Sequence, residues 1–147
     1  MKKRIFLMTV FGFFILIIFT GCAVDGLTYV IDKKLRGKWE TQTITYRGTV
    51  FNIGNVEIGG VLIKSRGWLF EERTIKLYHN GNIIQTFNDV YSDTPYSDIN
   101  TLEIYNISDQ YMTHYIQYKG NTSLIMGKDA YFGNIDSCKR VNRFSWE

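Results

Sequence analysis

The sequence predicts an all-β domain, and three observations carry that prediction. The 147 residues include 10 Tyr and 10 Phe together with many Thr, Ile and Val, which are the residue types that favour strands. Short apolar segments recur at hairpin spacing between turn sequences, with a single proline in the chain. No segment shows the period of an amphipathic helix. We expect about eight strands in an antiparallel up-and-down β-barrel, since closure removes exposed sheet edges; a β-sandwich is the alternative.

The folded part is expected to open with a strand from residue 39 onward. Apolar and polar residues alternate there, so that Thr41, Thr43 and Thr45 would share one face. Two short strands, 56–58 and 61–64, are expected to follow. They are separated by Gly59-Gly60, which suits a bulge or a bend.

The middle of the chain predicts a long strand over residues 68–78. The following His79-Asn80-Gly81-Asn82 is typical of a type I′ hairpin turn, so residues 83–90 would return beside that strand. The polar segment 91–100 contains Pro95 and is expected to be the longest loop. The remaining strands are expected at residues 101–107, 111–118, 122–128 and 138–144, separated by short turns.

The N-terminus has the pattern of a secretory signal. Lys2, Lys3 and Arg4 precede a mostly apolar run, residues 5–19. This run is shorter than the ~20 residues that a membrane-spanning helix needs. An uncleaved anchor is the alternative, because a helix of ~16 residues can cross a thin bilayer.

The end of this run, Phe19-Thr20-Gly21-Cys22, resembles the lipobox of bacterial lipoproteins, with Phe19 in place of the usual Leu. The resemblance implies that residues 1–21 are a cleaved signal peptide and that Cys22 is diacylated. Residues 22–34 would then be the lipid anchor and a short tether, and residues 35–147 the barrel domain. Ala23 after the cysteine implies the outer membrane, on its periplasmic face or at the surface. An ordinary signal peptide that happens to end in Cys is the alternative.

Charge and cysteine content argue against a nucleic-acid-binding protein and against a fold held together by disulfides. Cleavage would remove three of the 17 basic residues, and the remaining 14 would balance the 14 acidic ones. A neutral domain without a basic patch argues against nucleic acid as a partner. If Cys22 carries lipid, Cys138 has no disulfide partner, and we expect it to be a small buried apolar residue.

Gly37-Lys38-Trp39 resembles the Gly-x-Trp signature of the lipocalins and of small lipocalin-like lipoproteins of bacteria. The resemblance implies that Trp39 packs at the closed end of an eight-stranded barrel. It also implies that a late arginine, Arg140 or Arg143, covers this tryptophan. The domain is shorter than a full lipocalin, so its barrel is expected to be shrunken or filled. Eight strands leave room for packed side chains or one small ligand.

No catalytic or metal-binding pattern is apparent, so we expect neither an enzyme nor a cofactor. His79 is expected to be solvated at a hairpin tip, and His114 lies in a predicted strand, neither at metal-ligand spacing. Glu71 and Glu72 are neighbours on a predicted strand. They would therefore point to opposite faces and could not act together on one substrate.

The tyrosines are the strongest candidates for contact with a ligand or a partner. Tyr111 and Tyr115 are four residues apart and would share one face, whereas Tyr118 and His114 would share the other. We select Tyr111 and Tyr115, because tyrosine combines an apolar ring with a polar tip. Aromatic pairing across strands is the alternative explanation.

These observations lead to two hypotheses for a membrane-anchored envelope protein. The first is a non-catalytic binding module for a small hydrophobic ligand. The second is a surface or periplasmic protein with a filled barrel that interacts with an envelope or host protein. An open apolar cavity of roughly 300 Å³ or more favours the first. A solid core with an exposed aromatic patch favours the second.

Overall fold

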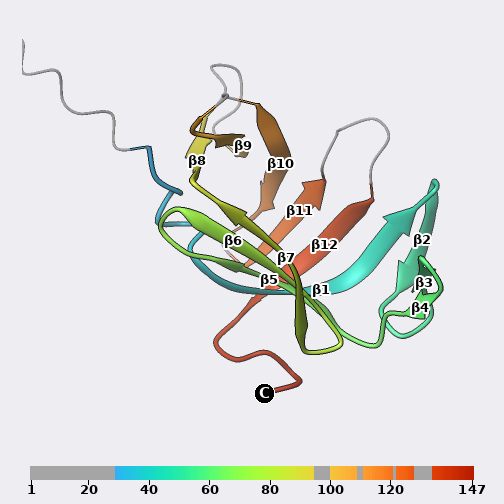
Figure 1. Cartoon of the computed structure of the whole chain (residues 1–147). Coiled ribbons are helices and arrows are strands. Elements are labelled where there is room, and N and C mark those ends of the chain that lie inside the picture. The colour runs from blue at the N-terminus through green and yellow to red at the C-terminus, as the bar shows by residue number, and fades with distance from the viewer. Residues whose placement is uncertain (1–28, 95–99, 109–110, 121, 128–133) are drawn as a thin grey trace, which may run out of the picture.

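The computed structural model describes residues 29–94, 100–108, 111–120, 122–127 and 134–147 (Figure 1). The predicted signal peptide, Cys22 and the first part of the tether lie outside these residues. Within the described ranges, no helix is long and apolar enough to span a membrane. The secondary structure there consists of twelve strands: β1 (Gly37–Tyr46), β2 (Thr49–Asn52), β3 (Glu57–Ile58), β4 (Val61–Leu62), β5 (Arg66–Phe70), β6 (Thr74–His79), β7 (Asn82–Asn88), β8 (Val90–Asp93), β9 (Thr101–Asn106), β10 (Met112–Lys119), β11 (Ser123–Gly127) and β12 (Ile135–Val141).

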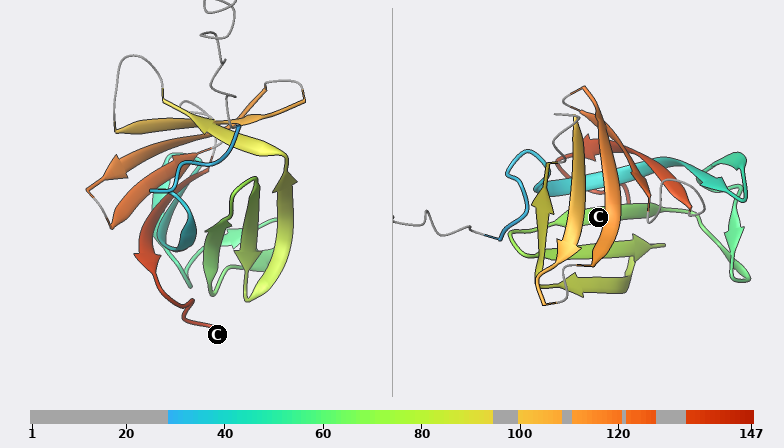
Figure 2. Two further views of the ribbon diagram at one scale, coloured as in Figure 1. Left: turned by 90° about the vertical axis from the view of Figure 1, so that its left-hand side faces the viewer. Right: turned by 90° about the horizontal axis from the view of Figure 1, so that it is seen from above.

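Nine strands form a nearly closed antiparallel barrel in the order β7-β6-β5-β1-β12-β11-β10-β9-β8 (Figure 2). The first and last strands, β1 and β12, pair over most of their length and so join the two halves of the ring. The predicted up-and-down barrel is therefore confirmed. The two ends of this order, β7 and β8, follow each other in the chain and meet at a corner, Asp89, whose φ is +52°.

The lead-in, residues 29–36, lies beside this corner and caps one end of the barrel. Its backbone bridges both halves of the sheet: the Ile31 amide donates to the Glu72 carbonyl at 2.8 Å, and the Ser92 amide donates to the Val30 carbonyl at 3.2 Å. Ile31 and Leu35 are completely buried. The described part of the predicted tether thus packs on the barrel and fixes where the chain leaves it.

An arm extends from the opposite end of the barrel (Figures 1 and 2). It consists of β2, which pairs with the second half of β1, and of the hairpin β3–β4. Ile44, Val56 and Ile63 form its own small core. Gly59-Gly60, expected to be a bulge or bend, forms the turn of this hairpin, with φ of +59° and +80°.

Several expectations for the strands were wrong. The closing strand, expected at residues 138–144, is β12 and spans Ile135–Val141. Residues 68–78 are not one strand, because Glu71, Glu72 and Arg73 are exposed in a turn that the Glu71 amide closes on the Thr74 carbonyl at 2.9 Å. Residues 91–93, expected in a loop, belong to β8, while residues 95–99 lie outside the described chain. The hairpin after β6 is as predicted, with positive φ at Asn80 and Gly81.

The alternation predicted for β1 also breaks. The register between β1 and β12 shifts between Thr41 and Thr43, so one residue bulges out of the ladder. Thr41 is buried inside the barrel, but beyond the bulge Ile44 is the next completely buried residue. Thr41, Thr43 and Thr45 therefore do not share a face, because the bulge redirects the second half of the strand toward the arm.

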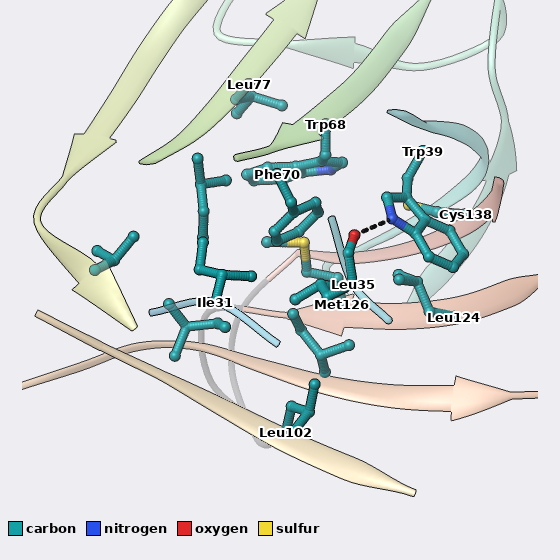
Figure 3. Packing of buried hydrophobic residues seen from close by; sticks show 14 residues of the cluster. Ile31, Leu35, Trp39, Trp68, Phe70, Leu77, Leu102, Leu124, Met126 and Cys138 are labelled. Carbon is teal, nitrogen blue, oxygen red and sulfur yellow. Dashed lines mark hydrogen bonds between the residues drawn. The ribbon is translucent and has the colours of Figure 1, made fainter. Parts of the chain in front are cut away.

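Apolar side chains fill the interior of the ring (Figure 3). Large rings from the first half of the chain, Trp39, Trp68 and Phe70, meet Leu124 and Met126 from the second half. All five are at most 4% exposed. The expectation of a filled barrel is thus supported for the side chains that the structure describes.

Candidate functional site

The capped end of the barrel is built around Trp39, which is completely buried. Its indole Nε1 donates to the Leu35 carbonyl at 2.7 Å, which ties the lead-in to the first strand (Figure 3). Arg140 covers the ring, with its guanidinium carbon 4.2 Å from the ring centre. A side chain at Gly37, where φ is +120°, would place its Cβ 3.2 Å from Arg140 Nη1.

Arg140, and not Arg143, therefore takes the covering position that the lipocalin resemblance implied. Besides stacking, Arg140 donates from Nη1 to the Arg36 carbonyl at 2.9 Å and from Nη2 to the Lys34 carbonyl. The guanidinium of Arg143 instead donates to the Glu147 carbonyl. One arginine thus joins the last strand, the tryptophan and the lead-in.

A cavity of about 690 Å³ lies beside this arrangement, between the lead-in and the barrel wall. The lead-in contributes Asp32, Lys33 and Lys34 to its lining, while the wall contributes Leu102, Tyr118 and Arg140. Leu102 and the ring of Tyr118 are the apolar surfaces among these six side chains. The cavity is thus polar at its lead-in side and partly apolar against the barrel.

Positive charge dominates the lining. Lys33, Lys34 and Arg140 carry three formal positive charges, whereas Asp32 carries the single negative one among the described lining residues. The carboxylate of Asp32 accepts the Lys34 amide at 2.7 Å, which orders the turn that presents both lysines. Because the chain from Cys22 onward is neutral overall, this lining is a local concentration of positive charge.

Tyr118 lines the cavity, and its hydroxyl lies near Asp32 and Arg140. The oxygen is buried and has no hydrogen-bond partner within the described part of the chain. Burial, followed by the nearby Asp32 carboxylate, raises the pKa of this phenol to about 12, although Arg140 opposes the shift. The hydroxyl is therefore protonated at neutral pH and can donate a hydrogen bond to a bound molecule.

The two tyrosines selected from the sequence lie outside this cavity. Tyr111 is 69% exposed. Tyr115 is half-buried, and its hydroxyl lies 3.5 Å from Thr101 Oγ1. The predicted division of faces is visible in the burial pattern: His114 and Ile116 are buried and Tyr118 lines the cavity, whereas Tyr115 is more exposed than its buried neighbours.

A second polar cluster lies inside the barrel, on Asp136, which is 1% exposed. Its Oδ2 accepts three hydrogen bonds: from Arg66 Nε and Trp68 Nε1, both at 2.6 Å, and from Thr41 Oγ1 at 3.1 Å. Its Oδ1 has no partner among the described residues. A buried carboxylate held by an arginine and two further donors ties three strands together.

His79 extends this cluster toward the surface. It is half-buried and accepts a hydrogen bond at Nε2 from the Arg66 guanidinium, so the expectation of a solvated histidine was wrong. Burial, followed by the charge of Arg66, lowers the pKa of His79 to about 4. His79 is therefore neutral at physiological pH.

Cys138 is buried, as predicted, and lies next to this cluster. Its Sγ is 3.6 Å from Thr41 Oγ1, and burial raises the pKa of the thiol well above its ordinary value. A thiol in that state is a poor nucleophile. Within the described ranges, no three His, Cys, Asp or Glu side chains lie close enough together to hold a metal ion.

Sequence reasoning missed Arg66 and Asp136 of the buried cluster and the role of Lys33 and Lys34 at the cavity, whereas Arg140 and Tyr118 were named but not placed at a common site. The inward face of β12 reads Asp136, Cys138, Arg140, and this period of two was a usable signal. We expected that strand to begin at residue 138, which left Asp136 outside it. Lys33 and Lys34 were assigned to a tether, and the turn that places them carried no motif.

The chemistry that the cavity supports is binding. Its described lining offers positive charge, a phenolic hydroxyl and a small apolar surface, which can hold an anionic or amphiphilic molecule. Comparison of the chain with protein-family models, with curated proteins and with solved structures gives no match.

Proposed function

We propose that this chain is a bacterial envelope lipoprotein, anchored through Cys22, whose lipocalin-like barrel is a non-catalytic binding module for a small molecule. The observation that carries the proposal is the cavity of about 690 Å³ beside the lead-in. Ligand pockets commonly measure roughly 300–1,000 Å³ and combine apolar walls with a few converging polar groups. The cavity matches that description in size and in its polar groups.

The bound molecule would lie at the end of the barrel and not along its axis. Trp39, Phe70 and Met126 fill the interior, so a hydrophobic ligand would have to displace packed side chains. The cavity instead offers Leu102 and the ring of Tyr118 for an apolar group, and charged side chains for a polar one. An amphiphile therefore suits the site better than the purely hydrophobic ligand expected from the sequence.

The anchor would hold this end of the barrel near the membrane. Tyr29, where the described chain begins, follows Cys22 by seven residues, and a fully extended chain of that length spans ~25 Å. Two acyl chains on Cys22 would hold the protein stably, since each buried CH₂ contributes ~0.8 kcal/mol. In fractionated cells, Cys22→Ala should move the protein from the membrane to the soluble fraction. Continued membrane association would indicate an uncleaved helix instead.

Native mass spectrometry tests the binding proposal. Residues 23–147, produced in a bacterial periplasm and purified without detergent, should carry an extra mass of a few hundred daltons. Thr94 also lines the cavity, so Thr94→Trp should reduce this adduct by filling space. Thr49→Trp on the exposed face of the arm is the control and should leave the adduct intact. A bare protein mass, even after incubation with fatty acids and envelope lipid extracts, would contradict the proposal.

A second function, interaction with an envelope or host protein, is favoured by the arm. Its apolar side chains Val50, Val61 and Leu62 are 65%, 51% and 45% exposed. Three exposed apolar side chains on one arm offer apolar surface that a partner protein could cover. Cross-linking in intact cells tests this function. A specific cross-linked partner that disappears with Val61→Asp and Leu62→Asp would support it, and an unchanged pattern would argue against it.

A further inference from the structure

We propose that the cavity is a phosphate site that binds the headgroup of an anionic lipid in the membrane to which the protein is anchored. This inference rests on the proposed function, because it names the class of ligand for the same cavity. It rests on the charge of the lining, the fixed position of Arg140, the hydroxyl of Tyr118 and the proposed position of the anchor.

The charge of the lining selects an anion. Lys33 and Lys34 are exposed at the cavity, and Arg140 lies at its wall. The single opposing charge among the described lining residues, Asp32, accepts a backbone amide at Oδ1. Two formal positive charges are therefore left over among the described lining residues, in a domain that is neutral as a whole.

Arg140 is held in place before any ligand arrives. Its stacking on Trp39 and its bonds to the carbonyls of Lys34 and Arg36 fix the guanidinium. Those bonds use Nη1 and Nη2, and an arginine has five N–H donors in all, so donors remain for an oxyanion. A prepositioned charge of this kind binds without the entropic cost of ordering a long side chain.

Tyr118 adds a neutral donor on the same wall. Its hydroxyl is buried and lacks a partner among the described residues, although such groups are normally hydrogen-bonded. A phosphate oxygen in the cavity would give it an acceptor. The barrel thus contributes a donor and a fixed charge, and the lead-in contributes two exposed charges.

The short distance along the chain from Cys22 to the cavity would place the site near a membrane. Lys33 and Lys34 follow Cys22 by 11 and 12 residues, and the arm lies at the opposite end of the barrel (Figure 1). Anchoring at Cys22 would therefore bring the lysines, and not the arm, close to the lipid headgroups. A soluble phosphate compound has the same chemistry, and the experiment distinguishes the two sources.

The test uses the chain from residue 22 with Cys22→Ser, so that only the barrel and its lead-in can hold the protein on lipid. Flotation with phosphatidylglycerol vesicles at ~0.15 M salt should exceed flotation with phosphatidylcholine vesicles. Each lysine near an anionic surface contributes ~1 kcal/mol, so Lys33→Gln with Lys34→Gln should weaken binding about 30-fold. Lys64→Gln with Lys139→Gln removes the same charge from exposed positions outside the lining and should change it less than threefold.

The variant Tyr118→Phe distinguishes binding in the cavity from binding to the charged surface around it. The substitution removes one hydroxyl and no charge, so it should weaken binding several-fold and leave the stability of the free protein unchanged. Full binding by Tyr118→Phe would overturn the cavity as the site. Equal loss in the control lysine pair would overturn it as well, because general surface charge would then explain the attraction.

Titration with glycerol 3-phosphate, followed by the NMR signals of residues 32–34 and 118, distinguishes the sources. Shifts there together with vesicle flotation support a lipid headgroup. Shifts without flotation overturn the membrane source and retain a soluble phosphate ligand. If neither the NMR shifts nor flotation is observed, the phosphate inference is overturned. A neutral adduct found by native mass spectrometry would then leave the proposed binding function standing, whereas a bare mass would remove both.

Discussion

Arg140 lies across the face of Trp39, with its guanidinium carbon 4.2 Å from the centre of the ring. The contact joins the first strand of the barrel to the last and lies directly under the lead-in. It depends on Gly37, since a Cβ at that position would approach Arg140 Nη1 to 3.2 Å. The spacing of Gly37 and Trp39 thus has a physical reason: the glycine leaves room for the arginine that covers the tryptophan.

Truncation of Trp39 should be among the most costly changes in the barrel. Because the ring is completely buried, Trp39→Ala should lower the free energy of unfolding by ~3–5 kcal/mol. Trp39→Phe keeps most of the packing but loses the bond to the Leu35 carbonyl, so it should cost less. Chemical denaturation measures both. A loss below about 1 kcal/mol for Trp39→Ala would contradict the closing role of this residue.

Arg140→Lys should destabilise the barrel despite the retained charge. A lysine cannot stack its head group flat on Trp39 while also donating to the carbonyls of Lys34 and Arg36. We expect a loss of about 1–2 kcal/mol, the worth of one or two such hydrogen bonds. Arg143→Lys is the matched control at an exposed position and should change stability by less than ~0.5 kcal/mol. Equal effects of the two substitutions would argue against the covering role.

Gly67→Ala should disturb the packing of the C-terminal segment. A Cβ at Gly67 would lie 2.6 Å from Phe144 Cε1 and 2.7 Å from Trp146 Cη2, closer than packed atoms approach. Overpacking of this kind typically costs ~1–3 kcal/mol. Phe144→Ala in the same chain should reduce the additional penalty of Gly67→Ala, because it removes one of the two rings. Additive losses in this double-mutant cycle would contradict the contact.

The lowered pKa of His79 predicts that the stability of the protein depends on pH. Its pKa is about 4 in the folded protein, below its ordinary value of 6.5, because burial and Arg66 disfavour the protonated form. Below pH 6.5 the unfolded chain therefore binds more protons at this residue, and stability should fall as the pH decreases from 6.5 toward 4. His79→Gln should flatten this part of the profile in denaturation experiments between pH 7 and 4.5. An unchanged slope would show that other groups dominate.

The barrel could be predicted from composition, turn sequences and hairpin spacing, but individual strand ends could not. In β5 the buried apolar side chains are even-numbered, Trp68 and Phe70, whereas in β6 they are odd-numbered, Ile75 and Leu77. That change of parity marks the turn at 71–73, and it is hard to recognise when helix-favouring residues lie between two apolar segments. The bulge in β1 hides the alternation in the same way.

The polar sites were harder to predict because distant parts of the chain build them. Arg66 and Asp136 are 70 residues apart, and only the closure of β1 between β5 and β12 makes them meet. The placement of Tyr115 and Tyr118 on different faces of β10 was predictable from spacing, whereas Tyr111 precedes that strand and the register shifts between Met112 and His114. Which face points inward was not predictable, because each face of that strand carries aromatic residues.

The most direct test of the account is to map where envelope lipids contact the protein. In NMR spectra of residues 23–147, added lipid extract should shift signals of Lys33, Lys34, Tyr118 and Arg140, and leave Val61 and Leu62 of the arm unchanged. This result would place the bound molecule at the anchored end of the barrel. Shifts confined to the arm, with the cavity residues unaffected, would contradict the account and make the arm the functional surface.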